Sequence, residues 1–243
     1  MTKMPENILI LGGGRSILPY ISLLQPLCAT NFTIACNYAY KTFQSTFLAF
    51  QDKNFYLPAH AKTDLEKNPD IYEELKTLPL IVGINRDGLE EFKLDNTILL
   101  DKKFSKPLTG ILALSLAVKF NPKNIYLLGF DWDRRAGLPE RNSNYNRYAD
   151  FSIHFYENVK HRGIGLIGYY ENHNPDNDFK DFIKTDINIY NVSLNSNIEC
   201  FPKISYEDMF NKLDSMSNKL DSNIINQNEL REEIKTLLSC KKS

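Results

Sequence analysis

The first candidate site is a glycine-rich loop that directly follows the apolar segment 8–11. It consists of Gly12, Gly13, Gly14, Arg15 and Ser16. Because glycine has no Cβ, the backbone N–H groups of such a loop can approach a phosphate closely, and Ser16 could cap the following helix, whose positive end favours an anion. The loop matches neither G-x-G-x-x-G, because Ile17 stands in place of the third glycine, nor a P-loop. We expect it to bind a nucleotide phosphate; a glycine turn without a ligand is the alternative.

Polar residues also stand at or just beyond the ends of other short apolar segments, namely Asn37, Asn85 and Asp131. In an open parallel sheet, ligands bind outside the carboxyl ends of the strands, so these side chains are expected to converge. Asn37 offers a donor and an acceptor to a sugar hydroxyl or a base edge, although an Asx turn would also explain it. Asp131 could act as a general base, bind a hydroxyl or hold a metal; capping the next turn is the alternative.

A third candidate is the pair Thr109 and Gly110, which opens the clearest apolar helical pattern of the chain, 109–120. A threonine in this position is typical of a helix cap. In a functional reading, the hydroxyl of Thr109 and the backbone N–H groups at this helix start would bind a phosphate.

Composition narrows the range of partners. The 243 residues contain 29 Lys and Arg against 30 Asp and Glu, so the net charge of −1 gives no overall attraction to nucleic acid or to anionic lipid. The four cysteines are widely spaced and no His pair has metal-ligand spacing, so we expect neither a zinc site nor a disulfide framework. The N-terminal apolar run is too short for a signal peptide or a membrane span. A reducing, cytoplasmic location is expected.

The elements that must position these residues follow a βαβ rhythm. Short apolar runs typical of buried parallel strands cover residues 7–11, 32–36, 80–84, 124–128, 164–170 and 187–192. Helical patterns lie between them at 64–77 and 109–120. This alternation predicts an α/β fold with a doubly wound, mostly parallel Rossmann-like sheet and helices on both faces.

Two regions depart from the rhythm. We expect residues 1–204 to form the nucleotide-binding domain, with a lid-like insertion at 132–175 that is rich in Arg, Tyr and Asn. The tail 205–243 has apolar residues at helical spacing, which predicts a C-terminal amphipathic extension of one or two helices. This extension could pack on its own domain or pair with a second copy in a homo-oligomer.

The three candidate segments together resemble known transferases. The stretch from Thr109-Gly110 to Gly129-Phe-Asp131 is similar to the central segment of bacterial family 42 sialyltransferases, in which a Thr/Ser-Gly pair opens a helix and a strand ends in Gly-x-Asp. Gly12 to Ser16 resembles the N-terminal Gly-Asn-Gly-Pro-Ser loop of that family, and Cys36-Asn37 resembles its Cys-Asn. MptE-like proteins, which include an archaeal pterin diphosphokinase and motility accessory factors, are similar in the same way.

This resemblance implies a nucleotide-dependent transferase, most simply a glycosyltransferase-like enzyme that moves a sugar from a nucleotide-sugar donor such as a CMP-sugar to a hydroxyl acceptor. It implies that the glycine loop, Asn37 and Thr109-Gly110 contact the nucleotide. It also implies that Asn195 and Ser196 help to close the nucleotide pocket, where a plain turn is the alternative. No metal is expected, and the small-molecule donor and acceptor are the expected partners.

The chain departs from the sialyltransferases at the general base, since the segment 142–148 contains no histidine. His154 and Asp131 are the candidate replacements; a packed helical residue is the alternative for His154. An ATP- and Mg²⁺-dependent diphosphokinase of the pterin type is a second hypothesis and would need Asp131 and its acidic neighbours as metal ligands. A nucleotide-binding or assembly protein without turnover is the third.

Overall fold

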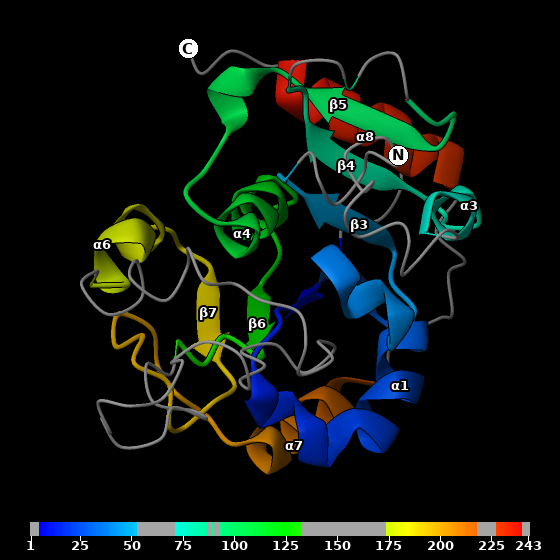
Figure 1. The fold of residues 1–243 in the computed structure, drawn as a ribbon. Helices are drawn as coiled ribbons and strands as arrows, with labels where there is room; N and C mark the ends of the chain where they lie inside the picture. The colour runs from blue at the N-terminus through cyan, green and yellow to red at the C-terminus, as the bar shows by residue number, and fades with distance from the viewer. Residues whose placement is uncertain are drawn as a thin grey trace, which may run out of the picture.

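The sheet predicted from the sequence is present in the computed structural model, which describes residues 5–52, 71–86, 89, 93–132, 174–217 and 227–239. The described residues contain one sheet in the order β5-β4-β3-β2-β1-β6-β7, and every neighbouring pair is parallel (Figure 1). The strands are β1 (Asn7–Leu11), β2 (Phe32–Cys36), β3 (Phe47–Phe50), β4 (Ile81–Ile84), β5 (Thr97–Leu100), β6 (Asn124–Leu128) and β7 (Asn188–Asn191). The predicted doubly wound α/β fold is therefore confirmed.

Burial on both faces explains why the central strands read as continuous apolar runs. All five residues of β1 are buried, as are those of β2 and β6 on either side of it. Ile8 pairs with Phe32 on one side and with Ile125 on the other, so side chains of three strands form one layer. Neither face of these three strands is exposed to water, as expected of a parallel sheet that is covered on both sides.

Helices cover both faces of the sheet (Figure 1). On one face lie α1 (Ile21–Thr30), α3 (Ile71–Lys76) and α7 (Tyr206–Ser217), and on the other lie α4 (Thr109–Lys119), α6 (Asp176–Phe179) and α8 (Gln227–Ser239). The first set buries Leu24, Leu75 and Met209 in one apolar cluster. The second set buries Leu112, Phe179 and Leu230 in the other cluster. The two faces therefore have separate cores, divided by the sheet.

Short 3-10 turns connect several of these elements. They are η1 (Arg15–Tyr20), η2 (Asn37–Lys41), η5 (Lys102–Phe104) and η6 (Lys180–Phe182). Both η1 and η2 begin at the carboxyl end of a strand, at residues that the sequence singled out. The candidate residues thus lie where the chain leaves the sheet.

The chain reverses its direction of travel across the sheet between β1 and β6. From β1 it proceeds outward through β2, β3, β4 and β5, and then crosses back through α4 to β6 and β7 on the other side of β1. In doubly wound sheets this switch point, at the carboxyl ends of the strands, is where ligands bind. In this fold the switch point lies between the loops that follow β1 and β6.

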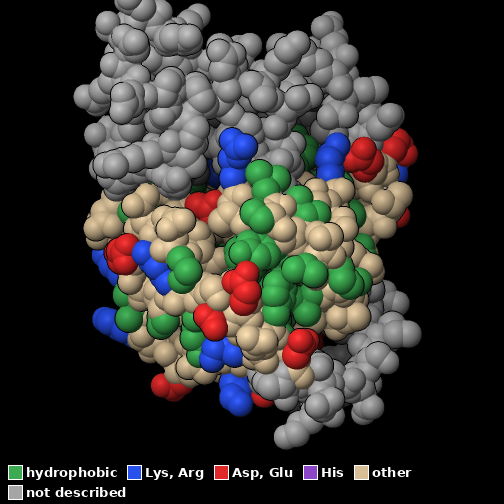
Figure 2. All heavy atoms as spheres, turned by 90° about the horizontal axis from the view of Figure 1, so that it is seen from below, with side chains coloured by type: hydrophobic (Ala, Val, Ile, Leu, Met, Phe, Trp, Pro, Cys, Tyr) green, Lys and Arg blue, Asp and Glu red, His purple; other side chains and the backbone are tan. Residues whose placement is uncertain are grey.

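The C-terminal helices pack on the chain's own sheet. Met209 and Leu213 of α7 lie in the cluster that also contains α1, and Leu230 and Ile234 of α8 lie in the cluster that contains α4. Of the two alternatives for the tail, packing on its own domain is thus the one found for these side chains. Figure 2 views the molecule from the side of α1 and α7, where apolar side chains gather amid scattered charges. In the described part of the chain, no helix is both long and apolar enough to cross a membrane.

Candidate functional site

The glycine loop after β1 is bonded directly to the segment after β6. The backbone N–H of Gly12 donates to the carbonyl oxygen of Leu128 at 2.8 Å, and that of Gly14 donates to Gly129 at 2.8 Å. A Cβ on Gly12 would lie 2.6 Å from the Gly129 oxygen, and a Cβ on Gly14 would lie 2.5 Å from the Asp131 carboxylate. These two glycines therefore permit the close approach of another part of the chain, which favours the alternative of a glycine turn.

Asp131 occupies the place where a phosphate was expected. Its Oδ2 accepts a 2.8 Å hydrogen bond from the backbone N–H of Ser16, and its Oδ1 accepts a short hydrogen bond from the Ser16 hydroxyl. Gly14, which has no side chain, is the N-cap of η1, so the predicted cap by Ser16 is not found, and the Asp131 carboxylate places a negative charge at the positive end of this turn. Of the loop amides, those of Gly13 and Arg15 are the ones that donate to no other described residue.

Tyr206 of α7 joins this cluster from the far end of the sequence. Its Oη lies 3.5 Å from the Ser16 Oγ, and its ring stacks on that of Tyr20 at a centroid distance of 4.0 Å. Burial raises the pKa of Tyr206 above its ordinary value, and the Asp131 carboxylate adds to the rise while the Ser16 hydrogen bond lowers it. The phenol therefore stays protonated and can donate. Tyr206 lies three residues before Met209, at the helical spacing of the tail, and such spacing carries no signal for a contact with Ser16, 190 positions away.

Asn37 and Thr109 meet at the end of β2. The Thr109 hydroxyl donates to the Asn37 Oδ1 at 3.3 Å, although the two residues are 72 positions apart. Asn37 has a φ of 49°, a left-handed conformation that asparagine tolerates better than most residues. Thr109 is the first residue of α4, whose N-cap is Leu108 without a side-chain bond, so Thr109 does not act as the helix cap. The structure thus brings together all three segments on which the resemblance rests, because the stretch 109–131 contacts Asn37 at its start and the glycine loop at its end.

The start of α4 keeps backbone donors available beside this pair. Ile111 and Leu112 both donate to the Leu108 carbonyl, whereas no described carbonyl outside the helix accepts from Thr109 or Gly110. A Cβ on Gly110 would lie 2.7 Å from the Phe130 ring, so glycine is needed for this ring to pack against the helix start. Unpaired N–H groups at a helix N-terminus favour an anion.

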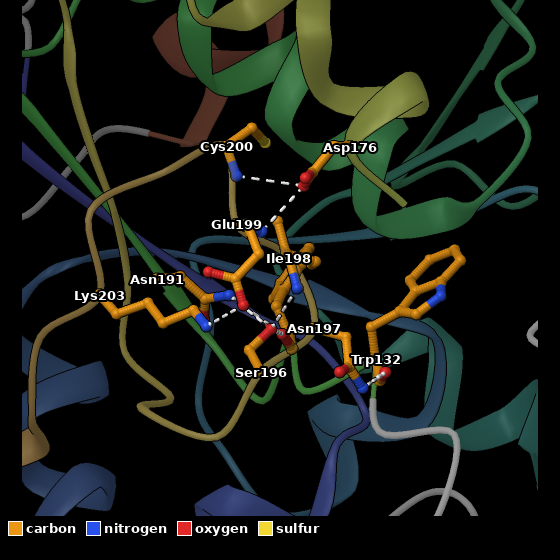
Figure 3. A network of polar contacts seen from close by, with 10 residues as sticks. Trp132, Asp176, Asn191, Ser196, Asn197, Ile198, Glu199, Cys200 and Lys203 are labelled. Atoms are coloured by element: carbon orange, nitrogen blue, oxygen red, sulfur yellow. Dashed lines mark hydrogen bonds and ion pairs between the residues drawn. The ribbon is translucent and has the colours of Figure 1, made fainter. Parts of the chain in front are cut away.

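The loop after β7 fixes the segment after β6 in place (Figure 3). The Ser196 hydroxyl donates to the Phe130 carbonyl at 2.7 Å and accepts from the Asn191 amide at 2.8 Å and from the Ile198 N–H at 3.0 Å. Ser196 is buried and its hydroxyl is fully used by the protein, whereas Asn195 is exposed. Ser196 is therefore a structural residue that links the loop after β7 to the Phe130 carbonyl. Any contribution that it makes to ligand binding comes through the position of Phe130.

The same loop also holds the two residues beyond Phe130. The backbone N–H of Asn197 donates to the Asp131 carbonyl at 3.0 Å, and its side-chain amide donates to the Trp132 carbonyl at 2.7 Å (Figure 3). The Asp176 Oδ1 in turn accepts from Glu199 and Cys200, which ties the loop to α6. Trp132 has a φ of 43°, so this network maintains a strained backbone next to Asp131. None of these partners could be identified from spacing along the chain.

The ends of β3 and β4 carry an arginine and two side-chain amides, Arg86, Gln51 and Asn85. Asn85, the remaining predicted strand-end residue, continues the ladder by donating its N–H to the Leu100 carbonyl at 2.6 Å. The neighbouring Arg86 donates from Nη2 to the Ser105 Oγ at 3.3 Å. The buried Gln51 accepts from the Lys106 N–H at 2.7 Å. These residues lead directly into α4.

Several predictions fall outside the described residues. These are His154, the strand at 164–170, the first half of the helix at 64–77 and residues 133–173 of the lid at 132–175. Among the described residues, no three His, Cys, Asp or Glu side chains gather closely enough to hold a metal. Cys28, Cys36 and Cys200 are free thiols.

The carboxyl edge of the sheet therefore has two sides. We call the loops after β1, β6 and β7 the β1–β6 side, and the ends of β2, β3 and β4 with the start of α4 the β2–β4 side. On the β1–β6 side, protein groups pair with most of the polar atoms that could bind a ligand. On the β2–β4 side, backbone N–H groups and a guanidinium keep donors that no described residue accepts. Chemically, the first side can hold a carboxylate rigidly, and the second can bind an oxyanion.

Comparison with known proteins adds no assignment to this geometry. No protein-family model, no curated protein and no solved structure matches the chain.

Proposed function

We propose that the protein is a nucleotide-dependent transferase, glycosyltransferase-like, that uses a nucleotide-sugar donor such as a CMP-sugar and a hydroxyl acceptor. The observation that carries the proposal is the hydrogen bond between Asn37 and Thr109 at the carboxyl edge. It joins the Cys-Asn and Thr-Gly segments that resemble those of family 42 sialyltransferases and MptE-like proteins. The left-handed backbone at Asn37 also supports a ligand role, since strained residues cluster at functional sites.

In this proposal the donor lies mainly on the β2–β4 side. The amide of Asn37 contacts the base or the ribose, and the N–H groups at the start of α4 stabilise the negative charge of the departing nucleotide phosphate. Because Gly12, Gly14 and Ser16 already donate within the protein, we assign the contact of the glycine loop to Gly13 and Arg15. The proposal includes a cytoplasmic location, which suits free thiols.

Two residues are proposed as the general base. Asp131 stands beside the edge, but both of its oxygens accept from Ser16, so proton transfer to Asp131 requires that the hydroxyl bond be exchanged for a substrate hydroxyl. His154 is the other candidate. Loss of transfer in Asp131→Asn with unchanged nucleotide affinity supports Asp131, and the same result in His154→Gln supports His154.

Calorimetric titration tests the donor assignment. CMP, UDP and GDP are titrated into the parent protein and into Asn37→Gly, which keeps the left-handed backbone accessible but removes the amide. Asn177→Ala, on the exposed surface of α6, is the matched control. We expect one nucleotide to bind the parent and the control equally and to bind Asn37→Gly at least tenfold more weakly.

Other results would redirect or end the proposal. If none of the three nucleotides binds, the donor assignment fails. If binding is unchanged in Asn37→Gly, the site assignment fails. Binding of ATP only with Mg²⁺ favours the diphosphokinase, and binding without product in a pooled donor and acceptor screen favours a protein without turnover.

A further inference from the structure

Arg86 carries an incompletely paired guanidinium inside the β2–β4 side. It follows β4 by two residues, and its Nε is buried without a hydrogen-bond partner among the described residues. Its Nη2 reaches the Ser105 hydroxyl at 3.3 Å, a long hydrogen bond to a neutral acceptor. Arg86 as a residue is half-buried, but a buried donor atom without an acceptor costs free energy in the folded protein.

No described acidic side chain neutralises Arg86. Within the described residues, none of the ion pairs includes Arg86. Ser105 is itself held by Gln51, whose Oε1 accepts from the Lys106 N–H at 2.7 Å and from the Ser105 Oγ at 3.5 Å. These contacts orient Ser105, and no described residue accepts from the Arg86 Nε.

The position of Arg86 relates it to the proposed nucleotide site. Neighbouring strands lie about 4.8 Å apart, so the ends of β2 and β4 are separated by roughly 10 Å. Ser105 precedes Thr109 by four residues, which span at most roughly 14 Å. One extended small molecule could therefore contact Asn37 and Thr109 at one end and Arg86 at the other.

We propose that Arg86 and Ser105 form an oxyanion subsite that binds a carboxylate or phosphate of the substrate. The Nε and one Nη of Arg86 donate side by side to two oxygens of the anion, a geometry that a planar guanidinium favours and a lysine cannot reproduce. The Ser105 hydroxyl donates to the same group in place of its long, 3.5 Å hydrogen bond to Gln51. The nature of the larger molecule rests on the proposed function; the affinity of Arg86 for an oxyanion does not.

The test follows the Arg86 Nε–H resonance in a nitrogen-edited NMR spectrum, assigned by its loss in Arg86→Lys. The probes are CMP, CMP-N-acetylneuraminic acid, free N-acetylneuraminic acid and inorganic pyrophosphate. We expect a carboxylated or phosphorylated probe to shift this resonance and to bind Arg86→Gln at least tenfold more weakly than the parent. Arg231, which donates to main-chain carbonyls of β5 and its approach, is the matched control: its resonance stays in place, and Arg231→Gln keeps the parent's affinity.

The probes separate this inference from the proposed function. If CMP binds at Asn37 but no probe moves the Arg86 resonance, the subsite is refuted and the nucleotide site stands. If an acidic probe moves that resonance while CMP does not bind, the subsite stands and the nucleotide assignment fails. A response to pyrophosphate but not to the sugar acids identifies the anion as a phosphate, and the reverse identifies it as a carboxylate.

Stability distinguishes a ligand-binding role from a structural one. Since the buried Nε lacks an acceptor, removing the charge in Arg86→Gln should leave the melting temperature of the ligand-free protein equal to or above that of the parent. A large decrease in melting temperature would mean that Arg86 supports the fold, and the inference would be abandoned.

Discussion

The β1–β6 side and the β2–β4 side lie on the same edge of one sheet, yet they use their polar atoms in opposite ways. On the first, the N–H groups of Gly12, Gly14 and Ser16 donate to the segment after β6, and Asp131 completes the arrangement. On the second, the start of α4 and the Arg86 Nε keep donors that no described residue accepts. Position at a switch point therefore does not by itself define a binding site; the unused hydrogen-bonding capacity does.

The loop after β1 also differs from a phosphate-binding loop in what its glycines make room for. In a phosphate-binding loop, glycine makes room for a ligand. In this protein the missing Cβ atoms of Gly12 and Gly14 make room for the backbone of Gly129 and the carboxylate of Asp131. Nearly the same sequence pattern thus serves stability when a carboxylate from the same chain occupies the place of the phosphate.

The largest effect on stability is expected from Asp131→Ala. The substitution removes the acceptor of the Ser16 N–H and of its hydroxyl, and hydrogen bonds to a charged group contribute about 1.5–3 kcal/mol each. We expect the free energy of unfolding in urea to fall by about 3 kcal/mol. Asp181→Ala, at an exposed position in η6, is the control and should change it by less than about 0.5 kcal/mol.

A double-mutant cycle sharpens this prediction. Ser16→Ala and Asp131→Ala should show a coupling energy of about 1 kcal/mol, because both remove the same hydroxyl–carboxylate bond. Strict additivity of the two substitutions would show that Asp131 does not hold the loop, and the two sides would then no longer differ as described.

Ser196→Ala should have the next largest effect. It leaves the Phe130 carbonyl, the Asn191 amide and the Ile198 N–H without their buried partner, which costs about 2 kcal/mol. The expected decrease in melting temperature is about 4–8 °C for a domain of this size. Ser22→Ala, exposed on α1, should leave the melting temperature unchanged. Equal effects of the two substitutions would mean that the hydrogen bonds of Ser196 do not stabilise the loop after β7.

Thr109→Val should change stability less and affinity more. The hydroxyl makes a single 3.3 Å hydrogen bond, so its loss lowers the free energy of unfolding by about 1 kcal/mol. Nucleotide affinity should fall at least tenfold in Thr109→Val and be largely restored in Thr109→Ser, which keeps a hydroxyl. A large stability loss with unchanged affinity would place Thr109 with the β1–β6 side, as a structural residue.

A further effect is expected only at high pH. Burial raises the pKa of the Cys36 thiol to about 12, whereas an unfolded chain loses this proton near its ordinary value of about 9. The contribution of Cys36 to stability is therefore present below pH 9 and is lost as the pH rises toward 12. Between pH 9 and 10.5, the stability of Cys36→Ala should fall less steeply than that of the parent. Parallel curves would mean that water reaches the end of β2, next to Asn37.

Much of the fold could be predicted from the sequence, because buried parallel strands are continuous apolar runs and α4 has strong helical periodicity. β3 and β5 were missed, since segments of four residues such as Phe47–Phe50 carry too little pattern to recognise alone. Asp131 and Asn37 were found because polar residues stand out after apolar strands. The boundary of α4 was predicted to within one residue, as Asn121-Pro122 ends it.

The partners of the candidate residues could not be predicted. Tyr206 reaches Ser16 over 190 positions, and Asn191 reaches Phe130 over 61 positions. Such contacts depend on the order of the strands, which periodicity does not encode. For the same reason the sequence could not show whether an internal carboxylate or a ligand takes the N–H groups of the glycine loop.

Hydrogen exchange followed by mass spectrometry, with and without saturating CMP, tests the division of the edge most directly. We predict that CMP slows exchange strongly in the peptide that covers 108–112 and only slightly in the peptide that covers 12–16, where the amides of Gly13 and Arg15 alone donate to no other described residue. Protection of residues 12–16 with no change at 108–112 would contradict the account.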